Sequence, residues 1–212
     1  MSKSVYSLLL NDEVIHLLDN MARVNGLSRS NMVEKILANA VGYETPEIRA
    51  NNIFLEIEKL LSRSNTMRYL EQPSSYMASI MSALSYRYNP AIKYSVELFP
   101  KSAHLGSLKV TLRTQNPTLI EHMSDFYRLF AFLEKKYYNE NAMHIVDGAR
   151  LTRLFTFPTQ AVTTKELAEH LTVYVKDFDE LLSLYFSNLT NPTAFSIIEK
   201  KFIDLKQNRI II

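Results

Sequence analysis

The stretch SVYSLLL, residues 4–10, limits the possible folds of this chain more than any other feature. Its side chains alternate between two sets, a period of two that is typical of a β-strand. The two sets are Tyr6, Leu8 and Leu10 on one side, and Val5, Ser7 and Leu9 on the other. A lone strand leaves backbone donors and acceptors unpaired along both edges. Since no second strand is predicted before about residue 92, this strand needs a partner from elsewhere.

Two helices are predicted directly after this strand. Asn11 is a suitable N-cap for the first helix, and Gly26 can take the left-handed conformation that ends it. Ser28 is a suitable cap for the second helix, and Gly42 follows its last turn. Apolar residues recur at helical spacing in both segments, from Val14 to Ala22 and from Met32 to Val41. Strand, helix, turn and helix therefore follow one another within residues 4–42.

Such a unit can complete its core by forming a two-fold dimer. The two strands then pair antiparallel, and the four helices pack beneath them. The segment MARVNGLSRSNMVEKIL resembles the end of the first helix, the turn and the second helix of ribbon-helix-helix repressors of the MetJ/Arc/CopG type. In that family a hydrophobic residue and Ala precede a Gly turn, which a Ser-basic-Ser cap follows. The resemblance covers residues 3–42.

The resemblance implies a homodimer that binds double-stranded DNA. In this family the paired strands enter the major groove, where outward side chains read base edges. The start of the second helix offers free N–H groups to a phosphate. The DNA-binding residues implied by the resemblance are Lys3, Val5, Ser7, Leu9, Ser28, Arg29 and Ser30. Tyr6, Leu8 and Leu10 are then expected in the dimer core. The resulting interpretation is a transcriptional regulator, with repressors as the model.

The outward positions differ from the family pattern, because Val5 and Leu9 are aliphatic. Aliphatic side chains can touch a thymine methyl but make no bidentate hydrogen bonds to bases. In one interpretation Lys3 and Ser4 reach past the strand, and DNA shape supplies the specificity. In another, the apolar ribbon is a protein–protein interaction module. A plasmid partition or conjugation accessory DNA-binding protein is a further alternative, since the fold also occurs there.

The rest of the chain, residues 45–212, resembles no family and is predicted to be a helix-rich α+β domain. Helices are predicted from Pro46, over residues 74–88, from Pro117 and over most of residues 164–206. Alternating residues near 92–98 and 108–112 predict a β-hairpin, and Asp147-Gly148 is a hairpin-turn signal. The predicted fold class is thus α+β and mostly helical. A ribbon-helix-helix domain, residues 1–44, is expected to precede a C-terminal domain, residues 45–212. The expected role of the C-terminal domain is assembly, including higher oligomers, or effector sensing.

Catalytic and metal sites have little support in the sequence. There is no Cys, the four Gly residues form no phosphate-binding loop, and the five His residues lack paired spacing. Asp177, Asp179 and Glu180 are interpreted as a solvated helix start. We therefore expect no enzyme, no cofactor and no metal. Without a signal peptide or a membrane-spanning apolar run, we expect a cytoplasmic protein with no membrane partner.

Overall fold

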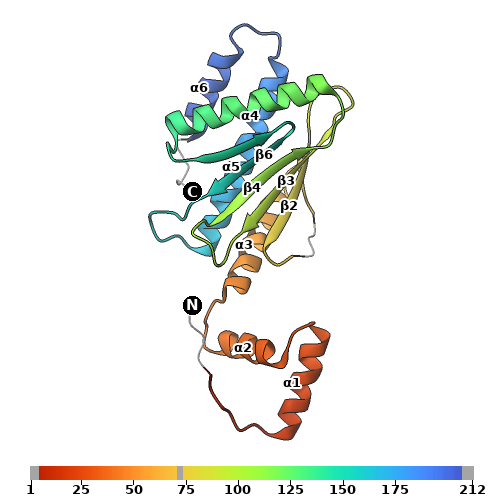
Figure 1. Cartoon of the computed structure of the whole chain (residues 1–212), viewed down its shortest axis with the longest axis vertical. Coiled ribbons are helices and arrows are strands. Elements are labelled where there is room, and N and C mark those ends of the chain that lie inside the picture. The colour runs from red at the N-terminus through yellow and green to blue at the C-terminus, as the bar shows by residue number, and fades with distance from the viewer. Residues whose placement is uncertain (1–4, 71–73, 207–212) are drawn as a thin grey trace. The chain divides into compact units, whose positions relative to one another are not determined.

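The computed structural model describes residues 5–70 and 74–206, which contain six helices and a six-stranded antiparallel sheet (Figure 1). The chain divides into two compact units, residues 1–46 and 47–212, called here the N-terminal unit and the C-terminal unit. The predicted α+β class is confirmed. The prediction of a single β-hairpin is wrong, because the sheet is much larger.

The N-terminal unit consists of α1 (Asp12–Val24) and α2 (Arg29–Ala40). The Asn11 side chain accepts a hydrogen bond from the Glu13 amide at 2.9 Å, and the Ser28 hydroxyl accepts one from the Asn31 amide at 3.3 Å. Both predicted caps are therefore confirmed, as is the left-handed Gly26 with φ of 64°. Residues 5–10 form no strand within the single chain, so the predicted ribbon is not confirmed.

The sheet of the C-terminal unit has the strand order β1-β2-β3-β4-β6-β5, and every neighbouring pair is antiparallel. The strands are β1 (Met67–Leu70), β2 (Met77–Ala83), β3 (Ala91–Leu98), β4 (Gly106–Leu112), β5 (Met143–Asp147) and β6 (Arg150–Phe155). The turn predicted at Asp147-Gly148 is confirmed as the β5–β6 connection, with Gly148 at φ of 54°.

The helix predicted over residues 74–88 is wrong, because β2 occupies this segment. Met77, Ile80, Met81 and Leu84 have helical spacing, but Ala78, Ile80 and Ser82 also alternate with their neighbours. The strand pairs with β1 on one side and β3 on the other, which satisfies its backbone groups along both edges. Tertiary pairing therefore decides between two patterns that the local sequence fits almost equally well.

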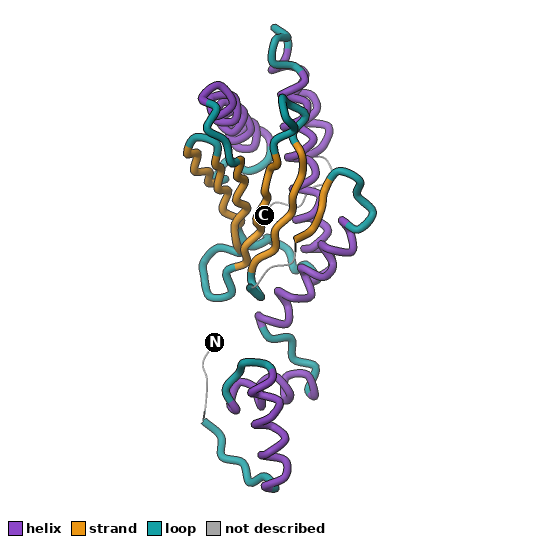
Figure 2. The backbone as a smooth tube through the Cα atoms, turned by 90° about the vertical axis from the view of Figure 1, so that its right-hand side faces the viewer, coloured by secondary structure: helices purple, strands orange, loops and turns teal. Residues whose placement is uncertain are grey.

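Four helices complete the C-terminal unit: α3 (Pro46–Leu61), α4 (Pro117–Tyr137), α5 (Thr164–Ser187) and α6 (Ala194–Lys206). All lie in segments where helices are predicted. Thr163 and Glu166 form the predicted capping box at the start of α5. Figure 2 shows the strands (orange) side by side, with helices (purple) packed against them.

Alternate residues of each strand form two faces of the sheet. The inner face carries fully buried residues such as Ile80, Tyr94 and Val110, which belong to the same core as residues of all four helices. Aromatic rings fill much of this core, and the Phe130 and Phe178 centroids lie 4.6 Å apart.

The opposite face is called here the outer face. It consists of Arg68, Leu70, Met77, Ser79, Met81, Ala83, Ala91, Lys93, Ser95, Glu97, Ser107, Lys109, Thr111, Met143, Ile145, Asp147, Arg150, Thr152 and Leu154.

Gly106 is where β4 approaches β3 too closely for any side chain. A Cβ atom at this position would lie 2.0 Å from the backbone carbonyl oxygen of Glu97. We expect Gly106→Ala to lower the free energy of unfolding by about 1–3 kcal/mol, the range for overpacking, measured by urea denaturation. Ser107→Ala is the matched control, because it removes a buried hydroxyl without a partner among the described residues. Equal stability of the Gly106 variant and the wild type would contradict the prediction.

Candidate nucleic-acid interface

Residues 5–10 project their side chains into solvent. Val5 is 98% exposed and Leu9 104% exposed, and Ser7 is exposed between them. On the alternate set, exposure falls from 84% at Tyr6 to 62% at Leu8 and 43% at Leu10. Lys3, also predicted to contact DNA, lies outside the described residues. The two sets of the predicted strand thus differ in exposure even within one chain.

The N-terminal unit has far more exposed than buried apolar side chains. Its buried hydrophobic residues are Leu18, Ala22, Met32 and Ala38. Among the described residues of this unit, twelve large hydrophobic side chains are exposed: Val5, Tyr6, Leu8, Leu9, Leu10, Val14, Leu17, Met21, Val24, Leu37, Val41 and Tyr43. Small units rarely build enough core alone, and clustered exposed apolar residues mark interaction surfaces. The described part of this unit therefore exposes the kind of apolar surface that marks interaction sites.

A second apolar stripe on α1 accounts for part of this excess. Leu18 and Ala22 are buried, whereas Val14, Leu17, Met21 and Val24 are exposed. These four recur at spacings of three, four and three residues, so they lie on one side of the helix. Helix α1 thus carries two buried apolar residues and, beside them, a set of four that stays 43–82% exposed.

The predicted phosphate-binding residues lie together at the start of α2. Ser28 is the N-cap, Arg29 is the first helical residue, and Ser30 is exposed beside it. The Arg29 side chain already has a partner, because its Nε and Nη2 atoms each donate to one oxygen of Asp19 at 2.6 Å. A phosphate at this helix start would therefore compete with Asp19 for the guanidinium.

The Arg29–Asp19 pair shifts the pKa of both groups. The hydrogen bond from Arg29 lowers the pKa of Asp19, and the same bond raises the pKa of Arg29. Both side chains are largely exposed, at 57% for Arg29 and 43% for Asp19. Exposed ion pairs of this kind contribute little to folding stability. Sequence reasoning missed this pair, since Asp19 lies ten residues earlier on another helix.

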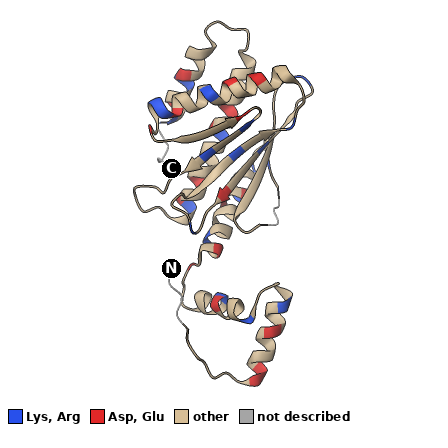
Figure 3. Cartoon of the chain, in the orientation of Figure 1, with Lys and Arg blue, Asp and Glu red and all other residues tan. Residues whose placement is uncertain are grey.

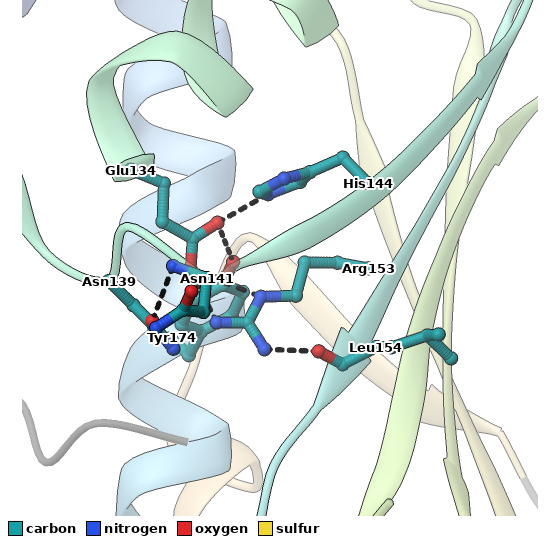
Figure 4. A network of polar contacts seen from close by, with 7 residues as sticks. All are labelled: Glu134, Asn139, Asn141, His144, Arg153, Leu154 and Tyr174. Carbon is teal, nitrogen blue, oxygen red and sulfur yellow. Dashed lines mark hydrogen bonds and ion pairs between the residues drawn. The ribbon is translucent and has the colours of Figure 1, made fainter. Parts of the chain in front are cut away.

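A separate polar cluster lies inside the C-terminal unit, where Glu134 of α4 meets Arg153 of β6 (Figure 4). The Arg153 Nε and Nη2 atoms donate to Glu134 Oε1 at 3.1 and 2.9 Å. Another Arg153 nitrogen, Nη1, donates to the Leu154 carbonyl. The side chains of Glu134 and Arg153 are both fully buried.

The second carboxylate oxygen of Glu134 accepts from two more elements. His144 Nε2 on β5 lies 2.5 Å from Oε2, and the Tyr174 hydroxyl on α5 donates to it at 2.9 Å. An ionised carboxylate has no proton to donate, so Nε2 of His144 carries the hydrogen. His144 Nδ1 is buried without a hydrogen-bond partner among the described residues.

Opposing effects set the charge of Glu134. Burial works to raise its pKa, but the hydrogen bond from His144 and the positive charge of Arg153 outweigh burial, and the pKa lies below its ordinary value. None of the four side chains in the network is more than 3% exposed. The network therefore ties α4, α5, β5 and β6 together and presents no reactive group to solvent.

The acidic residues predicted at a solvated helix start lie instead in the middle of α5. Asp179 accepts hydrogen bonds from the Tyr94 hydroxyl at 2.6 Å and the Ser82 hydroxyl at 3.1 Å. Burial raises the pKa of Asp179, and these hydrogen bonds offset the effect only in part. Asp177 is buried, and Glu180 pairs with Lys201 at 2.5 Å. The prediction of a solvated helix start is wrong, because α5 begins earlier, at its capping box.

Comparison with family models, with curated proteins and with solved structures finds no match to this chain. Among residues 5–70 and 74–206, no group of three or more His, Asp or Glu side chains is placed to hold a metal ion. None of the described helices combines the length and the apolarity required to cross a membrane.

Proposed function

We propose that this chain is a sequence-specific DNA-binding transcriptional regulator that acts as a homodimer through its N-terminal unit. The observation that carries the proposal is the excess of exposed apolar side chains around residues 5–10 and α1. A second copy supplies both missing elements, an apolar surface for the helices and a strand partner for residues 5–10. Because a two-fold axis passes through the paired strands, each copy provides the other with the same strand partner and the same apolar surface.

In this dimer Tyr6, Leu8 and Leu10 turn toward the four helices. These residues are the less exposed set already, and the stripe of Val14, Leu17, Met21 and Val24 is available to complete the shared core. Val5, Ser7 and Leu9 then lie on the outer surface of the ribbon and enter the major groove. Ser28, Arg29 and Ser30 hold the flanking phosphate at the start of α2. The C-terminal unit serves assembly or effector sensing.

A protein-docking ribbon is the second candidate function. The observation that favours it is the near-complete exposure of Val5 and Leu9, which are aliphatic and form no hydrogen bonds to base edges. A protein partner would cover these side chains, whereas a DNA groove would contact them chiefly through thymine methyl groups.

Selection of duplexes from a random library by the full chain tests the proposal. We expect one enriched, two-fold symmetric sequence. Leu9→Glu should abolish the specific binding to it, so that the selected duplex is bound no better than a random one, because the variant places a carboxylate against the phosphates. The dimer, checked by sedimentation, should remain. If Leu9→Glu binds the selected duplex normally but loses a protein partner, the ribbon is a protein-docking surface instead.

Two variants at the start of α2 separate phosphate contact from base contact in the same titrations. Arg29→Ala should weaken binding to all duplexes alike and make the dependence on salt shallower by about one phosphate contact. Asp19→Asn should do the reverse, because it frees the guanidinium from its ion pair. Neither should change the ratio between selected and random duplex. Equal effects of both variants in the same direction would mean that the ion pair acts only on folding.

A further inference from the structure

The outer face of the sheet carries a row of cationic side chains in one register. Arg68, Lys93 and Arg150 occupy alternate positions of a single cross-strand row, with Met81 and Thr111 between them. Arg68 and Arg150 are exposed, and Lys93 is half-buried. No ion pair is recorded between these three cations and another described residue. In Figure 3, blue segments on the strands of the sheet mark Lys and Arg residues.

The other charges of this face do not neutralise the row. Lys109, in the adjacent row, forms an ion pair with Glu97 at 2.8 Å. Asp147 lies opposite Arg150 at the far end of the row. Four cations and two anions therefore share this face. Its other residues are small, polar or partly exposed, whereas every buried hydrophobic residue of the strands lies on the inner face. A surface with this charge balance is complementary to a polyanion.

We propose that the outer face of the sheet binds the phosphate backbone of duplex DNA. The choice of DNA as the polyanion rests on the proposed function, whereas the charge of the face does not depend on it. The face carries no aromatic side chain. Proteins that bind single strands stack bases on aromatic rings, so this surface suits a duplex, whose bases are already stacked.

The spacing of the row fits a duplex backbone. Neighbouring strands lie about 4.8 Å apart, so cations on alternate strands are separated by roughly 10 Å and the row from β1 to β6 spans roughly 20 Å. Each strand of B-DNA carries one phosphate for about every 3.4 Å of helix axis. The row can therefore contact several phosphates without reading any base, which adds affinity and no sequence preference.

The test compares two triple variants of the full chain in binding to a random-sequence duplex at several salt concentrations. The first replaces the row: Arg68→Gln, Lys93→Gln and Arg150→Gln. The control removes the same charge from exposed positions elsewhere: Lys101→Gln, Lys135→Gln and Lys200→Gln. We expect the first variant to make the slope of log affinity against log salt shallower by about 2–3, at about 0.9 for each lost phosphate contact. The control should change the slope by less than about 1.

Both triple variants are first checked for a thermal unfolding midpoint equal to that of the wild type. If the row variant is less stable, the single change Lys93→Glu takes its place. Equal slope changes in row and control variants would overturn the inference, because net charge alone would explain them. Equally tight binding of a poly-glutamate peptide would overturn it in favour of an acidic protein partner.

The same measurements in the Leu9→Glu background separate the two proposals. If salt-dependent binding remains in this background and the row variant removes it, the outer-face inference is supported, whether or not the chain selects a sequence. Sequence-specific binding with a slope that the row variant leaves unchanged overturns the outer-face inference and leaves the proposed function intact. A chain that binds no duplex at all contradicts both.

Discussion

Glu134→Ala is expected to lower the free energy of unfolding by about 3–5 kcal/mol, the range for a buried charge that loses its partner. Among the described residues, Arg153 would then be fully buried with the Leu154 carbonyl as its one remaining acceptor, and Tyr174 would lose its acceptor at Oε2. Chemical denaturation monitored by tyrosine fluorescence and circular dichroism measures the loss. The N-terminal unit should not contribute, since the network lies wholly in the C-terminal unit.

Two further variants show whether the uncompensated charge is the cause. Glu121→Ala removes an exposed carboxylate from the same helix and should change stability by no more than about 0.5 kcal/mol. Glu134→Leu combined with Arg153→Met removes both charges, so it should be less destabilising than Glu134→Ala alone. If the double variant is as unstable as the sum of its single changes, the two side chains act independently and the interpretation is wrong.

Leu8→Asp is expected to abolish the dimer. In the proposed ribbon Leu8 faces the shared core, so the variant would bury two like charges close to the two-fold axis, at a cost of several kcal/mol. Sedimentation of the full chain should change from dimer to monomer, and circular dichroism should show loss of helix from the N-terminal unit.

Val5→Asp is the matched control for this prediction, because Val5 belongs to the opposite set of the ribbon and is 98% exposed. It should leave the dimer intact and weaken only DNA binding. A Leu8→Asp chain that remains a dimer, or a wild-type chain that is a stable monomer, would contradict the ribbon arrangement.

Local signals in the sequence predicted much of the helical structure correctly. Asn11, Ser28 and Thr163 cap helices as predicted, because capping depends only on residues within one turn. The β5–β6 turn at Gly148 is equally local. The local pattern of β2 wrongly predicts a helix, because the pairing of this strand with β1 and β3 depends on residues distant in sequence.

The polar contacts were harder to predict because each joins distant segments. Glu134 lies between apolar residues on the buried side of α4, and Arg153 lies between Leu151 and Phe155 on the inner face of β6. A charged residue at a buried position of a periodic pattern indicates a hidden partner, but the sequence does not say which one. The outer-face row likewise depends on the register of five strand pairs, which no local pattern supplies.

The Arg29–Asp19 pair has a consequence for how such a protein would search a genome. If the start of α2 binds a phosphate as proposed, a carboxylate that must first be displaced weakens every encounter with DNA by the same factor, whatever the base sequence. The preference for the correct site over random DNA is therefore kept, while the time spent on each incorrect site becomes shorter. Because random sites outnumber specific ones by about 10⁶–10⁹ in a genome, shorter stops increase the share of molecules that are free to reach the target.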